Sequence, residues 1–192
     1  MSKRNYGIVL LLLLFGVGIF ILFKNLNGGS NFMESNNETS KSTNQSSVSA
    51  QTDGIVADIK TSKGTIRVNL FTAETPQTVT NFIKKAQTGY YSNLTFHRVE
   101  DWVIQGGDPL GTGTGGGSMK TELTQRLFKE GSVGVARGGD ISISNDSQFF
   151  ICTTDCDWLT GKYTNFGEVT SGMDIARKIS VGDTILEISV IE

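Results

Sequence analysis

Two runs within residues 55–70 alternate apolar and polar residues, and a polar turn separates them at residues 62–64. The apolar positions of these runs are Ile55, Ala57, Ile59, Ile66, Val68 and Leu70. Successive side chains of a strand point to opposite faces, so this pattern predicts two paired strands with one buried face. The start of the folded domain is therefore a β-hairpin.

A helical pattern follows the hairpin. Thr75-Pro76 is a typical helix start, because proline fits the first turn, where its missing N–H costs nothing. Val79, Phe82, Ile83 and Ala86 then recur at helical spacing, and Gly89 ends the pattern. The sequence predicts one amphipathic helix that buries this stripe.

Short apolar runs continue to the end of the chain and predict further strands. They lie near residues 95–98, 103–106, 132–136, 148–152 and 165–169. A short helix is expected near 173–179, and a last strand is expected to place Leu186, Ile188 and Val190 on one face. Many short strands with few helices favour a mainly β fold, with the antiparallel sheet closed on itself.

The N-terminal part has a different character. Residues 7–23 are apolar and follow Lys3 and Arg4, which predicts a transmembrane signal anchor over 1–24 with its start in the cytoplasm. Residues 25–53 are rich in Ser and Asn and predict a disordered tether. The folded domain, 54–192, is then expected outside the cell membrane. A cleaved signal peptide and a secreted domain remain the alternative.

Charge and composition exclude several classes of function. The formal net charge of −2 gives no basic field for nucleic acid. One histidine and two cysteines match no common metal-site spacing, so no metal or other cofactor is expected. The sequence does not decide whether Cys152 and Cys156 pair, although two free thiols are the favoured interpretation.

The segment 96–109 places a guanidinium and an amide among large apolar side chains. If its two ends are neighbouring strands, Arg98 and Gln105 share a face, with Trp102 or Val103 between them. Such a surface suits a polar amide attached to an apolar ring.

This segment closely resembles the arginine-bearing signature of the cyclophilins, which are peptidyl-prolyl cis-trans isomerases. The resemblance continues in residues 147–151 and 158–167 and covers nearly all of 54–192. It implies a closed eight-stranded antiparallel barrel capped by two helices, with a peptide groove on the outside. One departure is a link from Arg98 to Gln105 that is one residue shorter than expected, with Glu100-Asp101 in place of the usual turn.

The resemblance also implies roles for individual residues. Arg98 is the expected catalytic residue, acting on the prolyl nitrogen. Proline-containing polypeptides are the expected partners, and Trp158 matches a position that favours cyclosporin-like ligands. The expected substrate-binding residues are Trp102, Val103, Gln105, Ala136, Arg137, Gln148, Phe150, Trp158, Leu159 and Tyr163.

Other interpretations of single motifs are weaker. Residues 111–116 fit G-x-G-x-x-G, but no βαβ unit surrounds them, so a glycine loop beside the groove is favoured over a nucleotide site. His97 is interpreted as a structural, hydrogen-bonding histidine, because no motif supplies the nucleophile and carboxylate of a hydrolase. The main alternative to an isomerase that assists folding of exported proteins is a non-catalytic proline-peptide-binding or chaperone module.

Overall fold

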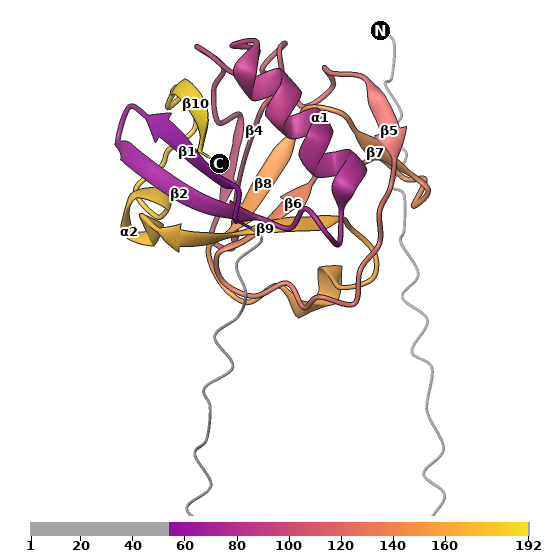
Figure 1. The fold of residues 1–192 in the computed structure, drawn as a ribbon. Helices are drawn as coiled ribbons and strands as arrows, with labels where there is room; N and C mark the ends of the chain where they lie inside the picture. The colour runs from indigo at the N-terminus through magenta and orange to yellow at the C-terminus, as the bar shows by residue number, and fades with distance from the viewer. Residues whose placement is uncertain (1–53, 192) are drawn as a thin grey trace, which may run out of the picture. The chain divides into compact units, whose positions relative to one another are not determined.

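The computed structural model describes residues 54–191, which form a curled antiparallel sheet with two α-helices (Figure 1). The sheet has eight strands in the order β10-β1-β2-β9-β6-β8-β4-β3, and β5 and β7 form a separate two-stranded ribbon. The strands are β1 Val56–Thr61, β2 Gly64–Leu70, β3 Arg98–Glu100, β4 Val103–Gly106, β5 Ser118–Lys120, β6 Ser132–Val135, β7 Ile143–Asn145, β8 Phe149–Cys152, β9 Asn165–Ser171 and β10 Ile185–Ile191. The helices are α1 Pro76–Gln87 and α2 Met173–Ala176, with a 3-10 turn, η1, at Asp157–Leu159.

The predicted hairpin and the first helix are confirmed. β1 and β2 pair in register from Val56↔Asn69 to Thr61↔Gly64. α1 has proline in its first turn and buries Val79, Phe82 and Ala86. The carboxylate of Glu122, from a distant loop, accepts the N–H groups of Gln77 and Thr78 at 3.1 and 2.7 Å. It thereby satisfies donors that a helix start leaves free.

The expected inward face of the last strand is wrong at its first position. Lys60 pairs with Glu187 but Thr61 pairs with Ile185, so Leu186 is an extra residue in β10. A bulge of this kind reverses the alternation of side chains on either side of it. Ile185 and Ile188 are consequently buried, while Leu186 is 52% exposed.

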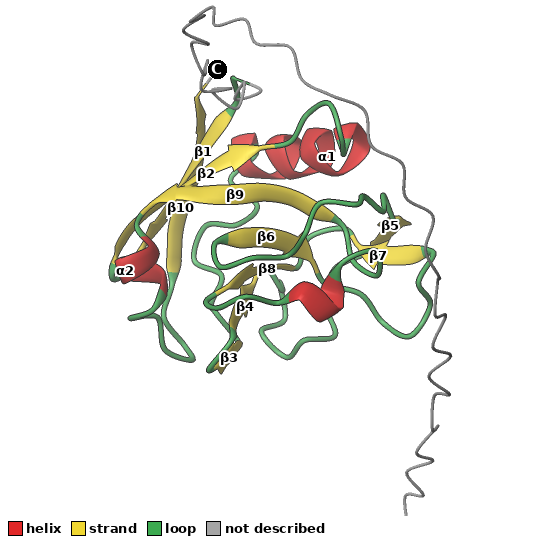
Figure 2. Cartoon of the chain, turned by 90° about the horizontal axis from the view of Figure 1, so that it is seen from below, coloured by secondary structure: helices red, strands yellow, loops and turns green. Residues whose placement is uncertain are grey.

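The prediction of a closed barrel is also wrong. No ladder joins the edge strands β3 and β10 of the described sheet, and only an isolated bridge, Thr95↔Thr184, spans the gap. Four backbone hydrogen bonds support this bridge between residues 93–96 and 182–185. Asn93 and Gly182 have φ of 65° and 91°, which are incompatible with extended strands, so the pairing does not continue. The fold is a curled half-barrel (Figure 2).

An aromatic cluster fills the inside of the curled sheet. The ring of Phe82, carried by α1, lies 5.3 Å from Tyr91, 5.8 Å from Phe149 and 5.2 Å from Phe166, measured between ring centroids. The rings are tilted or edge-on, which is the favoured arrangement for aromatic pairs. Because side chains occupy the interior, a ligand must bind on the outside.

The predicted anchor and tether, 1–24 and 25–53, lie outside the described residues. Within residues 54–191, no helix has the length and apolar character needed to cross a membrane.

Candidate active site

A groove of about 450 Å³ opens on the outside of the sheet, beside β4, β6 and β8. We call it the arginine groove. Its lining residues are Arg98, Trp102, Gln105, Ala136, Arg137, Phe150, Trp158, Leu159, Lys162 and Tyr163. The groove therefore brings together nine of the eleven residues that the sequence predicted.

Strand pairing sets the polar end of the groove. Arg98 on β3 faces Gln105 on β4, and Gln105 faces Phe150 on β8. Arg98 donates a hydrogen bond from Nη1 to Oε1 of Gln105 at 3.0 Å. The register thus places Arg98 and Gln105 together, as the alternation predicted, and adds the ring of Phe150 from a third neighbouring strand.

Phe150 forms the apolar floor of the groove. Its ring stacks on Phe128 with centroids 5.7 Å apart and meets the edge of Tyr163 at 5.8 Å. Its ring also covers Gly134 on β6, where a Cβ atom would lie 2.2 Å from Cζ of Phe150. A glycine is therefore required at 134 for the ring to lie this low.

The two tryptophans form one side of the groove. Their rings meet edge to face, with centroids 5.5 Å apart, and Trp158 is 53% exposed. Cζ of Arg98 lies 5.1 Å from the Trp102 ring, within the range of a cation–π contact. Trp102 also donates its indole N–H to Glu100.

On the opposite side, the Arg137 guanidinium lies over the Tyr163 ring at 4.4 Å. Its Nε donates to the main-chain oxygen of Lys162 at 2.8 Å. Lys162 lines the groove but was absent from the predicted set. Lys162 lies inside residues 158–167, one of the stretches that carry the resemblance, and this position was the one indication in the sequence that it lines the groove.

Two predicted residues do not line the arginine groove. Val103 is fully buried, in the same cluster as Phe150 and Cys152, so it supports the floor from below and does not contact a peptide in this conformation. Gln148 is 2% exposed and accepts a hydrogen bond from Nε2 of Gln105 at 2.9 Å. It orients Gln105 and lines a neighbouring hollow of about 280 Å³.

That hollow extends the arginine groove, since both are lined by Gln105, Ala136 and Arg137. Its wall includes the glycine loop, residues 111–117. Asp108 holds this loop by accepting backbone N–H groups, among them those of Leu110 and Thr112 at 2.9 Å. Burial alone would raise the pKa of Asp108, but these backbone donors lower it below its usual value. The loop is thus built around a carboxylate and contributes Gly113 and Gly117 to the wall of the hollow.

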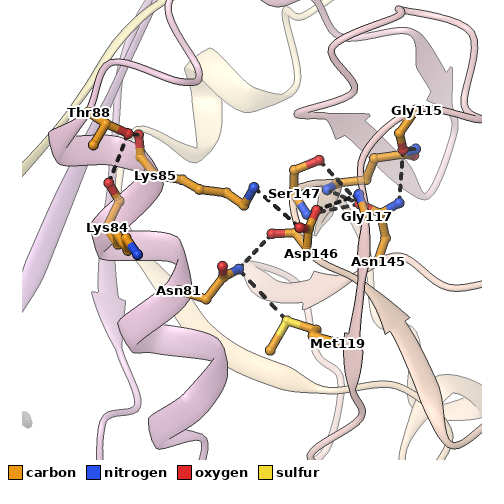
Figure 3. A network of polar contacts seen from close by, with 11 residues as sticks. Asn81, Lys84, Lys85, Thr88, Gly115, Gly117, Met119, Asn145, Asp146 and Ser147 are labelled. Atoms are coloured by element: carbon orange, nitrogen blue, oxygen red, sulfur yellow. Dashed lines mark hydrogen bonds and ion pairs between the residues drawn. The ribbon is translucent and has the colours of Figure 1, made fainter.

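A polar network ties the glycine loop to α1 (Figure 3). Asp146 accepts the N–H of Gly117 at 2.7 Å on its side chain, and its main-chain oxygen accepts Nδ2 of Asn81 at 2.6 Å. Lys85 lies 3.4 Å from the same carboxylate. No sequence pattern indicated this contact between helix and loop, which holds the outer wall of the hollow.

The remaining candidate groups lie outside the arginine groove. Both ring nitrogens of His97 are buried without a hydrogen-bond partner within residues 54–191, so its expected hydrogen-bonding role is not confirmed. Burial lowers the pKa of His97, so the imidazole is neutral near pH 7. Cys152 and Cys156 are free and buried, as favoured, and burial raises the pKa of both thiols. Among the described residues, no group of three or more His, Cys, Asp or Glu side chains is placed to hold a metal ion.

Residues 56–189 match the family profile described as cyclophilin type peptidyl-prolyl cis-trans isomerase/CLD. The chain belongs to the cyclophilin-type peptidyl-prolyl cis-trans isomerases. This cyclophilin domain is 43% identical over 136 residues to a peptidyl-prolyl cis-trans isomerase of Helicobacter pylori, covering 67% of this chain and 82% of that protein. It is 39% identical over 137 residues to peptidyl-prolyl cis-trans isomerase 9 of Schizosaccharomyces pombe, covering 68% of this chain but only 22% of that longer protein.

Solved structures agree on the fold. A crystal structure of a cyclophilin type peptidyl-prolyl cis-trans isomerase from Cryptosporidium parvum, determined in the presence of the dipeptide Ala-Pro, superposes with a TM-score of 0.67 at 27% identity. The match covers 71% of this chain and 99% of that one. Cyclophilin family membership therefore rests on sequence and fold together.

Proposed function

We propose that the chain catalyses cis-trans isomerisation of Xaa-Pro bonds in the arginine groove. The observation that carries this proposal is the guanidinium of Arg98, held by the side chain of Gln105 beside the apolar floor formed by Phe150. The solved relative studied with Ala-Pro supports a proline-containing ligand.

The reaction needs a cation and a pocket, with no covalent intermediate and no cofactor. Amide resonance raises a rotational barrier of about 18–20 kcal/mol, and the twisted state localises the lone pair on the prolyl nitrogen. A hydrogen bond from Arg98 to that nitrogen stabilises the twisted state more than the planar one. Phe150, Leu159 and Tyr163 hold the proline ring while the preceding carbonyl turns.

The main chain next to β6 would fix the direction of the peptide. Ala136 donates to the oxygen of Gln148 at 3.0 Å and accepts the N–H of Asn145 at 2.8 Å, so its backbone is held on both sides. The backbone N–H and C=O of Arg137 have no partner within residues 54–191. They are available to pair with an extended peptide, as a sheet edge does.

Catalysis is tested with Arg98→Ala and Arg98→Lys in the full chain, solubilised in detergent, using a proline tetrapeptide. Loss of one preorganised charged donor is expected to lower kcat/KM about 100-fold or more in the alanine variant. Lysine should restore little, because it lacks the planar fork of donors. EDTA and nucleotides should leave the rate unchanged. Near-normal turnover in Arg98→Ala, with unchanged circular dichroism, contradicts the mechanism. If the unaltered chain binds the peptide but does not isomerise it, the alternative of a non-catalytic binding module is supported.

Trp158 is the basis for proposing that cyclosporin-like ligands bind the same groove. It is exposed at the edge of the groove and contacts Trp102. Such a ligand should compete with the tetrapeptide, and inhibition should weaken in Trp158→Ala.

We further propose, from the sequence alone, that residues 1–24 anchor the domain to the cell membrane and that it assists folding of exported proteins. Residues 7–23 have the length and apolar character of a single span. Protease added to intact spheroplasts should release an active fragment. A domain that is protected until the membrane is breached contradicts this orientation, and recovery of the domain in the medium without protease indicates a cleaved signal peptide.

A further inference from the structure

Glu100 is the last residue of β3 and comes directly before the turn to β4. Glu100 pairs with Val103, so only Asp101 and Trp102 connect β3 to β4. Two-residue hairpins favour turn types that need a positive φ. Neither Asp101 nor Trp102 has one. The position of Trp102, which lines the arginine groove, must therefore depend on a further contact.

The carboxylate of Glu100 supplies that contact and joins two groove residues. Its Oε1 accepts Nε–H of Arg98 at 2.8 Å, and its Oε2 accepts Nε1–H of Trp102 at 2.9 Å. Each oxygen therefore holds one side chain. These contacts keep Cζ of Arg98 5.1 Å from the centroid of the Trp102 ring. The pairing with Arg98 lowers the pKa of Glu100, so the carboxylate is ionised near pH 7.

This contact also divides the donors of the catalytic arginine. A guanidinium has five N–H donors in a fixed plane. Nε is bound by Glu100 and Nη1 by Gln105. Nη2 has no hydrogen-bond partner within residues 54–191. The two acceptors, on Nε and Nη1, thus orient the group and leave Nη2 for substrate.

We propose that Glu100 is a positioning residue of the isomerase, which orients Arg98 and Trp102 together for the twisted amide. This inference rests on the proposed activity. Glu100 does not line the groove. Its loss should therefore change how well the two groups meet the transition state and leave ground-state binding of the peptide nearly unchanged.

Removal of Glu100 has a second, electrostatic effect, which acts on kcat in the opposite direction. A carboxylate paired with Arg98 offsets part of the positive charge that the prolyl nitrogen would feel. If this electrostatic effect outweighed orientation, removal of Glu100 would raise kcat. Because the Glu100 side chain is 47% exposed, solvent screens its charge, and we expect orientation to decide the sign.

The experiment compares Glu100→Ala and Glu100→Gln in the full chain, with kcat and KM measured separately by NMR exchange on a proline peptide. Glu100→Ala should lower kcat about three- to tenfold with less than a twofold change in KM. Glu100→Gln keeps one acceptor oxygen and should fall between. Glu187→Gln is the matched control, because Glu187 also pairs with a basic side chain, Lys60, and is 55% exposed but lies on β10 away from the groove. It should retain full activity.

A double-mutant cycle separates positioning from a general loss of structure. In an Arg98→Ala background, Glu100→Ala should lower the residual rate by less than twofold, since its main effect passes through the missing arginine. An unchanged or raised kcat in Glu100→Ala, or an equal loss with and without Arg98, overturns the proposal. If the unaltered chain does not isomerise proline peptides, the proposed function itself fails, whatever these variants do.

Discussion

The contact between Gly134 and Phe150 offers the most direct test of the groove floor. The change is Gly134→Ala, which adds one methyl group on β6. The new Cβ would lie 2.2 Å from Cζ and 2.7 Å from both Cε atoms of Phe150. Carbon atoms normally approach to about 3.5 Å, so the ring must move by more than about 1 Å.

The surroundings of the ring determine the size of the effect. Phe150 is 4% exposed and lies between Phe128 and Tyr163, so the free space open to its ring is the arginine groove above it. Overpacking of this kind costs about 1–3 kcal/mol in the free energy of unfolding. For a domain of this size, that corresponds to a fall in Tm of about 3–12 °C. Displacement of the proline-binding surface should also lower kcat/KM about 10- to 100-fold.

The assay pairs thermal unfolding with the tetrapeptide isomerisation rate. Gly139→Ala is the matched control, because a methyl group added at this position would have no atom within 4 Å, the φ of Gly139 is not positive, and Gly139 lines neither the groove nor the hollow. This control should change neither quantity. If Gly134→Ala keeps both the Tm and the rate, Phe150 is not fixed by β6, and the account of the groove floor is wrong.

Two further predictions concern buried groups. Burial holds the pKa of His97, the only histidine, below its unfolded value of about 6.5. The free energy of unfolding should therefore be highest above that pH, where the imidazole is neutral in both states, and should fall as pH decreases to about 5.5. His97→Gln should remove this slope in urea titrations, and a slope that persists would assign it to other groups. Cys152 and Cys156 should resist a thiol reagent at pH 8 until urea unfolds the domain, and rapid labelling of either thiol in the native state contradicts the buried, protonated thiols described here.

Local patterns predicted the parts of the fold that depend on neighbouring residues. Alternation defined the β1–β2 hairpin, and helical spacing defined α1. Arg98 and Gln105 were expected on one face, and the β3–β4 register places them opposite each other. Each of these relations is set by a few consecutive residues, which is why the sequence alone is sufficient.

Other features depend on contacts between distant segments. The bulge at Leu186 arises from how β10 meets β1, and the open edge arises where residues 93–96 meet 182–185. The contact of Glu100 with Arg98 and Trp102 was visible in the sequence only as a shortened turn. Which side chains a carboxylate reaches depends on turn geometry, and residue type does not specify it.

The pairing of the first strand with the last has a consequence for how the domain matures. β1 lies between β2 and β10, and Val56 pairs with Ile191 near the very end of the described chain. During synthesis, β1 can form its hairpin with β2 early, but its other edge stays unpaired until β10 has emerged. An exposed strand edge invites pairing with other chains. The domain therefore completes its sheet only after β10 has emerged, and until then the free edge of β1 can pair with other chains.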